Sequence, residues 1–311
     1  MRGKRITTAI IVTLLLALLV PVQASAIDRI DLNRSVSLTL RTADTGVRGG
    51  TDTGAAGMTF DIYRVADTDD EANFTLTGSF AGYKVQVNGL DSQGWADLAQ
   101  TLSGYVARDG IAASVEGRLD TSGMITFRSL KAGLYLVDGS TYSNGKYVYS
   151  SSPFMISLPD RDQNSESWDY DVTSVLKMTA GGIDKNPVKL NVHKVWDDAG
   201  REQDRPESIT VQLYKDGKVT DTVKLSEKNS WRHSWQVESG HDYRIAETDT
   251  AGYTCSVTCS GNDYTITNTS VLPPETEKLP QTGVLWWPVP VLIVTGLGCI
   301  IIGLLRRRGS E

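Results

Sequence analysis

Most of the chain between residues 27 and 270 consists of short runs in which apolar and polar residues alternate, with turn residues between them. MTFDIYRVA at residues 58–66 and VKLNVHKVW at 188–196 are two such runs. Alternation with a period of two predicts strands with one buried face, and frequent turns favour antiparallel pairing. The Asn-Gly pair at residues 144–145 and the Asp-Gly pair at 216–217 each lie between apolar runs and predict hairpins.

One segment follows a helical period instead. Apolar residues recur at helical spacing from Trp95 to Tyr105. The spacing predicts a helix from Ser92 to about Val106, and Asp91 or Ser92 is suited to cap it. The second half of the chain shows no such pattern, so we expect a mostly all-β protein with one helix inserted in its first half.

Both ends of the chain are apolar. A basic start, an apolar run and the triplet Ala-Ser-Ala at residues 24–26 are typical of a signal peptide covering residues 1–26, with an uncleaved anchor as the alternative. Residues 284–305 carry no charge and are followed by three arginines. As a helix this segment spans ~33 Å, enough for a bilayer, and we expect 306–311 to be a cytoplasmic basic tail. A buried core helix is the alternative for residues 284–305.

Charge and residue types exclude several functions. The chain has a net charge of −6 at pH 7, and removing the two basic ends makes it more negative. This charge argues against nucleic acid or an anionic membrane surface as a partner. His193, His233 and His241 are scattered, and the sequence contains no metal-ligand spacing, Ser/His/Asp arrangement or phosphate loop. We therefore expect no enzyme, no cofactor and no metal.

Cysteine usage is sparse. Cys299 lies in the apolar C-terminal run, which leaves Cys255 and Cys259 for the body of the chain. Along a straight strand these two residues are ~13 Å apart, beyond the ~7 Å reach of a disulfide. Two buried thiols are expected, unless the strand turns between them and allows a bridge.

Three strands of the second half place a polar residue on the face that their apolar residues assign to the core. The residues are Lys194 after Val192, Glu247 after Ile245, and Asn268 after Ile266. An isolated buried charge is too costly to persist, so the three side chains should meet. They form either a buried ion pair beside an amide or an intramolecular Lys-Asn isopeptide bond. In the second case neutral Lys194 attacks the Asn268 carboxamide, and protonated Glu247 assists.

The C-terminal end resembles the LPxTG cell-wall sorting signal of Gram-positive surface proteins, in which the motif precedes an apolar segment and a basic tail. The resemblance implies that a sortase attacks the Thr282 carbonyl, releases the chain from Gly283 onward, and passes the acyl group to an amine of a peptidoglycan precursor or another subunit. Membrane attachment would then last only until this cut. The matching residues are Leu279, Pro280, Gln281, Thr282 and Gly283.

The second half also resembles a known family. KVWDD, RPESITVQLYKDG, NSW, YRIAET and YTITNT are similar to the B-type repeat of the collagen adhesin Cna. More loosely, MTFDIYRVAD, SGMITFRSLKAGLYLVDG, SPFMISLP and WDYDV resemble the N-terminal domain of sortase-assembled pilins. The resemblances imply two tandem β-sandwiches of immunoglobulin or prealbumin type. They also imply an isopeptide bond between Lys194 and Asn268, formed with Glu247 as the catalytic residue.

Together these features predict a structural pilus subunit, secreted and anchored to the cell wall by sortase. Its partners would be sortase, a peptidoglycan precursor and other pilins. The alternative is a monomeric wall-anchored adhesin that binds a host surface ligand.

A pilin of this type implies an acceptor lysine, for which Lys177 after WDYDVTSVL is the candidate, although the usual Val-Tyr-Pro-Lys setting is missing. The expected parts are a signal peptide (1–26), a pilin N-terminal domain (27–178), a linker (179–186), a Cna B-type domain (187–270), a stalk (271–278), the sorting signal (279–283), a membrane helix (284–305) and a tail (306–311).

Overall fold

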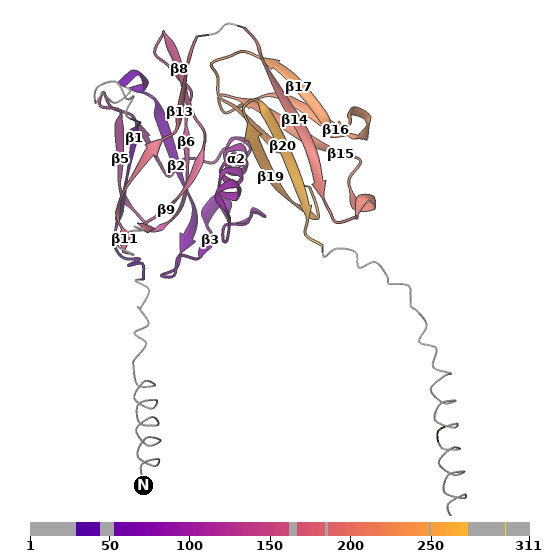
Figure 1. The fold of residues 1–311 in the computed structure, drawn as a ribbon, viewed down its shortest axis with the longest axis horizontal. Helices are drawn as coiled ribbons and strands as arrows, with labels where there is room; N and C mark the ends of the chain where they lie inside the picture. The colour runs from indigo at the N-terminus through magenta and orange to yellow at the C-terminus, as the bar shows by residue number, and fades with distance from the viewer. Residues whose placement is uncertain are drawn as a thin grey trace, which may run out of the picture. The chain divides into compact units, whose positions relative to one another are not determined.

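The computed structural model describes residues 29–43, 53–161, 167–183, 186–248 and 250–272, together with Gly296. The expected signal peptide, sorting signal and basic tail lie outside these residues, and so does the expected membrane helix apart from Gly296. Within the described ranges, no helix has the length and apolar character needed to span a bilayer. Most of the described chain is β structure with one α-helix, as the sequence predicts (Figure 1).

The described residues fall into two units. Residues up to Asp197 and from Pro206 to Val271 form one compact unit, which contains both β-sandwiches. The turn from Asp198 to Arg205 belongs to the other unit. In that turn a short 3-10 helix, η3 (Glu202–Asp204), is followed by Arg205, whose guanidinium pairs with the Asp198 carboxylate.

The first sandwich contains two facing sheets. Their strand orders are β12-β1-β5 and β3-β2-β6-β9, with β4 also paired to β2, and the smaller sheets are β13-β8-β7 and β10-β11. Two 3-10 turns, η1 (Thr53–Ala55) and η2 (Gly78–Phe80), lie in its connections. The strands are β1 (Val36–Thr42), β2 (Thr59–Thr68), β3 (Phe74–Leu76), β4 (Val115–Arg118), β5 (Met124–Leu130), β6 (Gly133–Gly139), β7 (Tyr142–Ser143), β8 (Tyr147–Ser151), β9 (Phe154–Leu158), β10 (Asp160–Arg161), β11 (Trp168–Asp169), β12 (Asp171–Leu176) and β13 (Met178–Gly182).

Alternating side chains build the core of this sandwich. Strand β1 buries every second residue along its length, including Leu38 and Leu40. Phe60 and Ile62 of β2 face them from the other sheet, and Val172 and Leu176 of β12 join the same cluster. The predicted alternation of these strands is therefore confirmed.

The predicted helix is α2 (Ser92–Asp109). Asp91 caps its start, because the Asp91 carboxylate accepts a hydrogen bond of 2.8 Å from the Gly94 amide. The helix continues three residues beyond the expected end and stops at Gly110, whose φ of 61° is readily adopted by glycine. Leu98, Leu102 and Tyr105 are buried, as the spacing predicts.

The second sandwich pairs a four-stranded sheet, β17-β14-β20-β19, with a three-stranded sheet, β16-β15-β18. Asp216 and Gly217 both have positive φ at the turn between β15 and β16, as the predicted hairpin requires. A further 3-10 turn, η4 (Glu227–Asn229), precedes β17. The strands are β14 (Val188–Asp197), β15 (Ser208–Lys215), β16 (Lys218–Ser226), β17 (Arg232–Val237), β18 (Tyr243–Glu247), β19 (Tyr253–Ser260) and β20 (Asp263–Ser270).

The pairing departs from the expected antiparallel pattern at two places. β1 pairs in parallel with β12, and β14 pairs in parallel with β20. Parallel neighbours need a long connection, and in each sandwich the pair consists of an early and a late strand with the other strands between them. The first and last strands of the second sandwich therefore run side by side in the same direction.

The connection between the sandwiches also begins later than the sequence suggested. Residues 178–182 form β13, which pairs with β8 along its whole length. Gly181 and Gly182 indicated a linker, but they lie at the exposed edge of this small sheet, where no side chain has to pack. The first sandwich therefore extends to Gly182 rather than to Met178.

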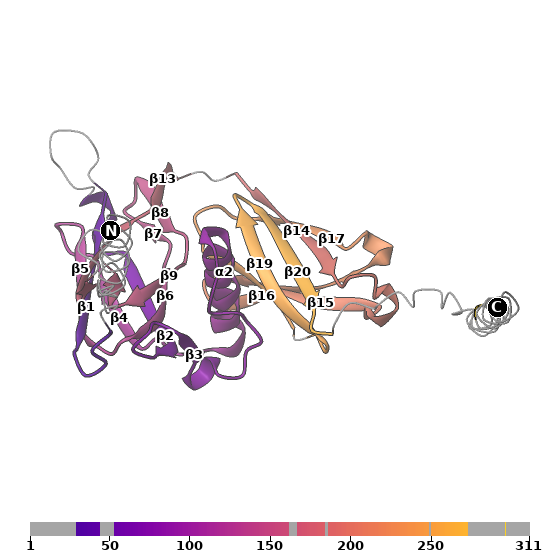
Figure 2. The same cartoon turned by 60° about the horizontal axis from the view of Figure 1, so that its bottom comes forward.

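Helix α2 packs against the second sandwich as well as the first (Figures 1 and 2). A methyl group on Gly104 would lie 2.3 Å from the Ile245 carbonyl oxygen, so only glycine allows this approach. The Thr101 hydroxyl accepts a hydrogen bond of 2.8 Å from the Val257 amide. Buried Arg244 donates to Ser103 on α2. These short contacts join the helix to β18 and β19.

Candidate functional site

Three strands of the second sandwich bring Lys194, Glu247 and Asn268 into its interior. Lys194 lies on β14 and Asn268 on the parallel strand β20, where Trp196 of β14 is the register partner of Asn268. Glu247 ends β18 in the facing sheet. All three residues are at most 2% exposed, which confirms that they are on the core face.

The Glu247 carboxyl group contacts both other side chains of this triad. Lys194 Nζ lies 3.7 Å from Glu247 Oε2. Asn268 Nδ2 donates a hydrogen bond of 2.7 Å to Glu247 Oε1. The carboxyl group of Glu247 thus lies between the amine that would attack and the nitrogen that would leave.

Two acceptor atoms of the triad are not used in hydrogen bonds to the described residues. Glu247 Oε2 and Asn268 Oδ1 are both buried without a hydrogen-bond partner there. Lys194 Nζ instead donates to the carbonyl oxygens of Val195 and Ile266, at 3.0 and 3.5 Å. A buried polar group without a partner is costly, so the three side chains are not arranged as a fully satisfied ion pair and amide.

Burial favours the protonated form of Glu247. Loss of solvent raises the pKa of the Glu247 carboxyl group, and this effect outweighs the opposing influence of Lys194 and of the hydrogen bonds from Thr250 and Asn268. A protonated carboxyl group can donate to a carbonyl oxygen and then deliver a proton to a leaving amine.

Aromatic side chains cover the lysine. The Trp196 ring centroid lies 4.3 Å from Lys194 Nζ. Trp231 and Tyr253 both pack edge-on against Trp196, with ring centroids 5.2 and 5.0 Å away. This wall shields the amine from solvent, and Lys194 is only 2% exposed.

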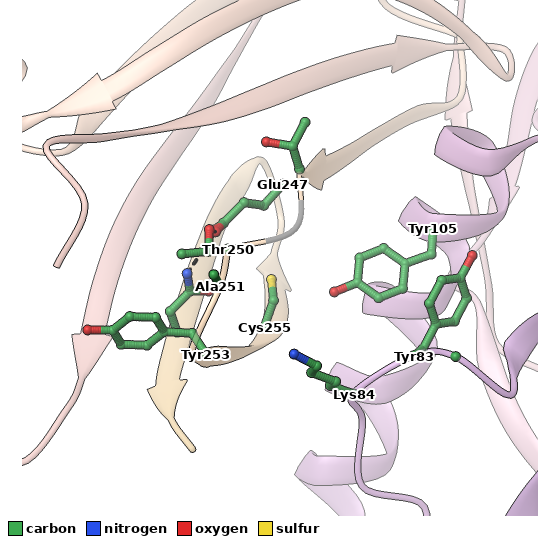
Figure 3. A pocket seen from close by; sticks show the side chains of 11 residues that line it. Tyr83, Lys84, Tyr105, Glu247, Thr250, Ala251, Tyr253 and Cys255 are labelled. Carbon is green, nitrogen blue, oxygen red and sulfur yellow. Dashed lines mark hydrogen bonds between the residues drawn. The ribbon is translucent and has the colours of Figure 1, made fainter. Parts of the chain in front are cut away.

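A cavity of about 220 Å³ reaches the triad from the side of α2 (Figure 3). Glu247 and Asn268 line its inner end, and Thr250 and Cys255 lie beside them. Tyr83 and Tyr105 line the opposite side next to each other, and Lys84 lies below them in this view (Figure 3).

The structure adds two contacts to Glu247 that the alternating pattern did not reveal. The Thr250 hydroxyl donates to Glu247 Oε1, the oxygen that also accepts from Asn268. Arg108 of α2 donates a hydrogen bond of 3.0 Å to the Glu247 backbone carbonyl. Thr250 lies after the end of β18, where strand parity carries no information, and Arg108 is distant in sequence.

The remaining candidate residues are placed as follows. Lys177 is exposed between β12 and β13, in agreement with its predicted parity. Cys255 and Cys259 are free, half-buried thiols on β19, and burial raises the pKa of Cys255 to about 12. Within the described ranges, no cluster of histidine, cysteine or acidic residues is placed to hold a metal ion. The LPQTG residues and Cys299 lie outside the described residues.

Comparison with known proteins supports one assignment directly. Residues 190–269 match the family model of the Cna protein B-type domain. This range extends from β14 to β20 and includes the whole triad, so the match covers almost the entire second sandwich. A search of curated proteins finds no match for the chain.

Several solved structures are similar to the chain at low identity. A single B repeat unit of the collagen-binding surface protein Cna of Staphylococcus aureus has 17% identity and a TM-score of 0.26, covering 76% of this chain and 98% of that one. The full-length major pilin SpaD from Corynebacterium diphtheriae has 16% identity and a TM-score of 0.30, and the match covers 78% of this chain and 65% of SpaD. The shaft pilin SpaA from Lactobacillus rhamnosus GG has 15% identity and a TM-score of 0.25, and the match covers 77% of this chain and 99% of SpaA.

The triad geometry predicts a covalent product in the folded chain. The intact mass of residues 27–282, secreted without the C-terminal segment, should be lower than the sequence mass by one ammonia molecule. The Glu247→Ala variant should have the mass calculated from its own sequence, with no loss of ammonia, because the proton relay is removed. Glu238→Ala, at a residue exposed on the same sandwich, should keep the ammonia loss. An unmodified wild-type mass would leave only a buried ion pair.

The Thr250 contact predicts a slower reaction when it is removed. Thr250→Val eliminates one hydrogen bond to the reacting carboxyl group, worth ~1 kcal/mol, so cross-linking should slow by roughly five-fold while still reaching completion. The fraction of linked chain can be followed by intact mass after a pulse of cell-free synthesis. Thr248→Val, at an exposed neighbouring threonine, serves as the control. Equal rates for the two variants would show that Thr250 does not position Glu247.

Proposed function

We propose that this chain is a structural subunit of a sortase-assembled pilus on a Gram-positive cell surface, with an intramolecular isopeptide bond in its second sandwich. The observation that carries the proposal is the buried triad of Lys194, Glu247 and Asn268, with a carboxyl group between the amine and the carboxamide. The match of residues 190–269 to the Cna B-type domain supports it.

The bond forms in a single turnover within the chain, so the protein is not an enzyme. Lys194 transfers a proton to Glu247, and its neutral Nζ attacks the side-chain carbonyl carbon of Asn268. The protonated carboxyl group of Glu247 hydrogen-bonds the developing oxyanion at Oδ1, and its proton then passes to Nδ2. The carbon–nitrogen bond to Nδ2 breaks and ammonia leaves. The attacking Nζ then gives its surplus proton to the Glu247 carboxylate, and a new neutral amide joins the two side chains.

The strand arrangement suits a subunit that carries tension. β14 and β20 are the first and last strands of the second sandwich and run in parallel. A force applied at the two ends of this sandwich therefore acts on the strands that the bond joins. With Lys194 and Asn268 linked, the force passes through a covalent bond rather than through hydrogen bonds, and the residues between them stay folded.

Export and anchoring follow from the order of signals in the sequence. A signal peptide (1–26), the two domains, a stalk and LPQTG at 279–283 precede an apolar segment and three arginines. In this scheme the precursor is membrane-anchored only until sortase cuts after Thr282. The Thr282 acyl group is then joined to a subunit amine or a peptidoglycan precursor.

A monomeric wall-anchored adhesin would share the sorting signal and the isopeptide bond, but it would not need an acceptor amine. Lys177 favours the polymeric subunit. It is exposed at the end of β12, where β13 begins, in the first sandwich. A sortase acyl-enzyme must reach the attacking amine, and this position meets that requirement.

The sorting signal predicts where the mature protein ends. Thr282→Ala should leave the protein in the membrane fraction, because sortase forms its acyl-enzyme on the Thr282 carbonyl. The wild type should appear in wall fragments released by a muralytic enzyme, with Thr282 as its last residue by mass spectrometry. Gln281→Ala, at the variable position of the motif, is the control. A Thr282→Ala protein that is still linked to the wall would refute the sorting mechanism.

The acceptor assignment predicts a change in polymer formation. Wild-type chain expressed with its sortase should give a ladder of high-mass species that withstands boiling in detergent. Lys177→Arg keeps the charge but is a far poorer nucleophile, so the ladder should disappear. Lys146→Arg, at another exposed lysine of the first sandwich, should preserve it. A ladder that persists in Lys177→Arg would assign the acceptor to another lysine.

A further inference from the structure

The second sandwich has an open side between two end strands. β18 is the end strand of the sheet β16-β15-β18, and β19 is the end strand of the sheet β17-β14-β20-β19. Among the described residues, no further strand pairs with the outer edge of either one. Helix α2 of the first sandwich packs against both strands instead (Figure 2). An end strand exposes unpaired backbone groups, and α2 covers two such edges at once.

Side chains of α2 bind the backbone at both edges. The Thr101 hydroxyl accepts a hydrogen bond of 2.8 Å from the Val257 amide of β19. Arg108 Nη1 donates a hydrogen bond of 3.0 Å to the Glu247 carbonyl oxygen at the end of β18. Thr101 and Arg108 are about two helical turns apart, so they lie on one face of the helix. The helix therefore takes the place of solvent at backbone groups on these edges.

Docking in this arrangement requires a folded first sandwich. Arg244 of β18 is buried, and its guanidinium donates to the Ser103 hydroxyl of α2 at 2.6 Å and to the Asp138 carboxylate of β6 at 2.8 Å. Asp242 of the second sandwich also pairs with it. A buried charge depends on such partners, and Ser103 and Asp138 come from two different elements of the first sandwich. Both elements have to be in place before Arg244 is satisfied.

The triad lies behind the side that α2 covers. Glu247 and Asn268 line one end of the cavity of about 220 Å³, and Tyr83 and Tyr105 of the first sandwich line the other (Figure 3). Without those two tyrosines the cavity would be open to solvent on that side. Burial is the largest cause of the raised pKa of the Glu247 carboxyl group, so the docked first sandwich favours its protonated form.

We propose that docking of α2 onto β18 and β19 activates the triad, so that the bond between Lys194 and Asn268 forms only once the first sandwich has folded and docked. The inference rests on the proposed function, in which this bond forms. Arg108 is a positioning residue in this scheme, because it holds the backbone of Glu247 and does not touch the reacting atoms. A chain whose first sandwich is misfolded stays unlinked, and tension can still unfold its second sandwich.

Substitution of Gly104 separates docking from the stability of the helix. Gly104→Ala adds a methyl group 2.3 Å from the Ile245 carbonyl oxygen, although alanine by itself favours the helix. The full-length chain is made by a pulse of cell-free synthesis in detergent, and intact mass then follows the loss of ammonia. We expect cross-linking at least roughly ten-fold slower than in the wild type, because overpacking displaces the helix. Gly94→Ala, the same change in the same helix, is the matched control and should link at the wild-type rate, since its methyl group would contact only Leu90 and Asp91.

Two variants of Arg108 test its positioning role in the same assay. Arg108→Met removes the donor to the Glu247 carbonyl oxygen and should slow cross-linking roughly ten-fold. Arg108→Lys keeps a charged donor and should restore most of the rate. A lysine variant as slow as the methionine variant would reject the positioning role.

Cys255 reports docking independently of the bond. It lies in the cavity whose opposite side is formed by Tyr83 and Tyr105, so the first sandwich limits the access of a thiol reagent to it. Brief treatment with iodoacetamide immediately after synthesis, followed by peptide mass spectrometry, measures its alkylation. We expect faster alkylation in Gly104→Ala than in the wild type, and no change in Gly94→Ala.

Equal cross-linking rates for the wild type, Gly104→Ala and Arg108→Met would overturn the proposal. Slow cross-linking of Gly104→Ala without faster alkylation of Cys255 would also overturn it, because the triad would then be affected without loss of docking. If Gly104→Ala fails to fold, the rates of the Arg108 variants decide. Failure of the proposed function is separate: a wild-type chain that loses no ammonia rejects the bond itself, whereas a linked wild type with unaffected variants rejects only its dependence on docking.

Discussion

The burial of one amine, one carboxyl group and one carboxamide in an apolar sandwich is the constraint on which this account depends. Lys194, Glu247 and Asn268 are each at most 2% exposed, so a charge on one of them depends on the other members of the triad for stabilisation. The contacts do so only in part, since Glu247 Oε2 and Asn268 Oδ1 have no hydrogen-bond partner among the described residues. Condensation removes the amine and the carboxamide as separate polar groups and leaves one amide in their place.

The surrounding structure holds the triad in this arrangement. The parallel pairing of β14 with β20 places Lys194 and Asn268 two residues apart in register, and Glu247 reaches them from the facing sheet. Thr250 orients the carboxyl group, while Arg108 of α2 binds the backbone of the same residue. The helix of the first sandwich is thereby packed against the strand that carries Glu247.

Local patterns in the sequence predicted the features that depend on local geometry. A period of two identified the strands and placed Lys194, Glu247 and Asn268 on the core face, and a helical period located α2 and its Asp91 cap. The parallel strand pairs and β13 were not predicted, because pairing partners are chosen by long-range packing. The close approach of Gly104 to the Ile245 carbonyl oxygen could not be predicted from the sequence either, because a glycine within a helix can be present for several reasons. Thr250 lies outside a strand, so only the folded backbone brings it to Glu247.

Single-molecule force spectroscopy tests the central claim, covalent closure of the second sandwich, most directly. The chain is held at its two ends and stretched until both sandwiches have been loaded. The account predicts that the wild type releases no length from residues 195–267, because the Lys194–Asn268 bond bypasses them. Glu247→Ala should release that segment in one additional step, of up to ~3.3–3.6 Å per residue. Release of the same segment by the wild type would contradict the account.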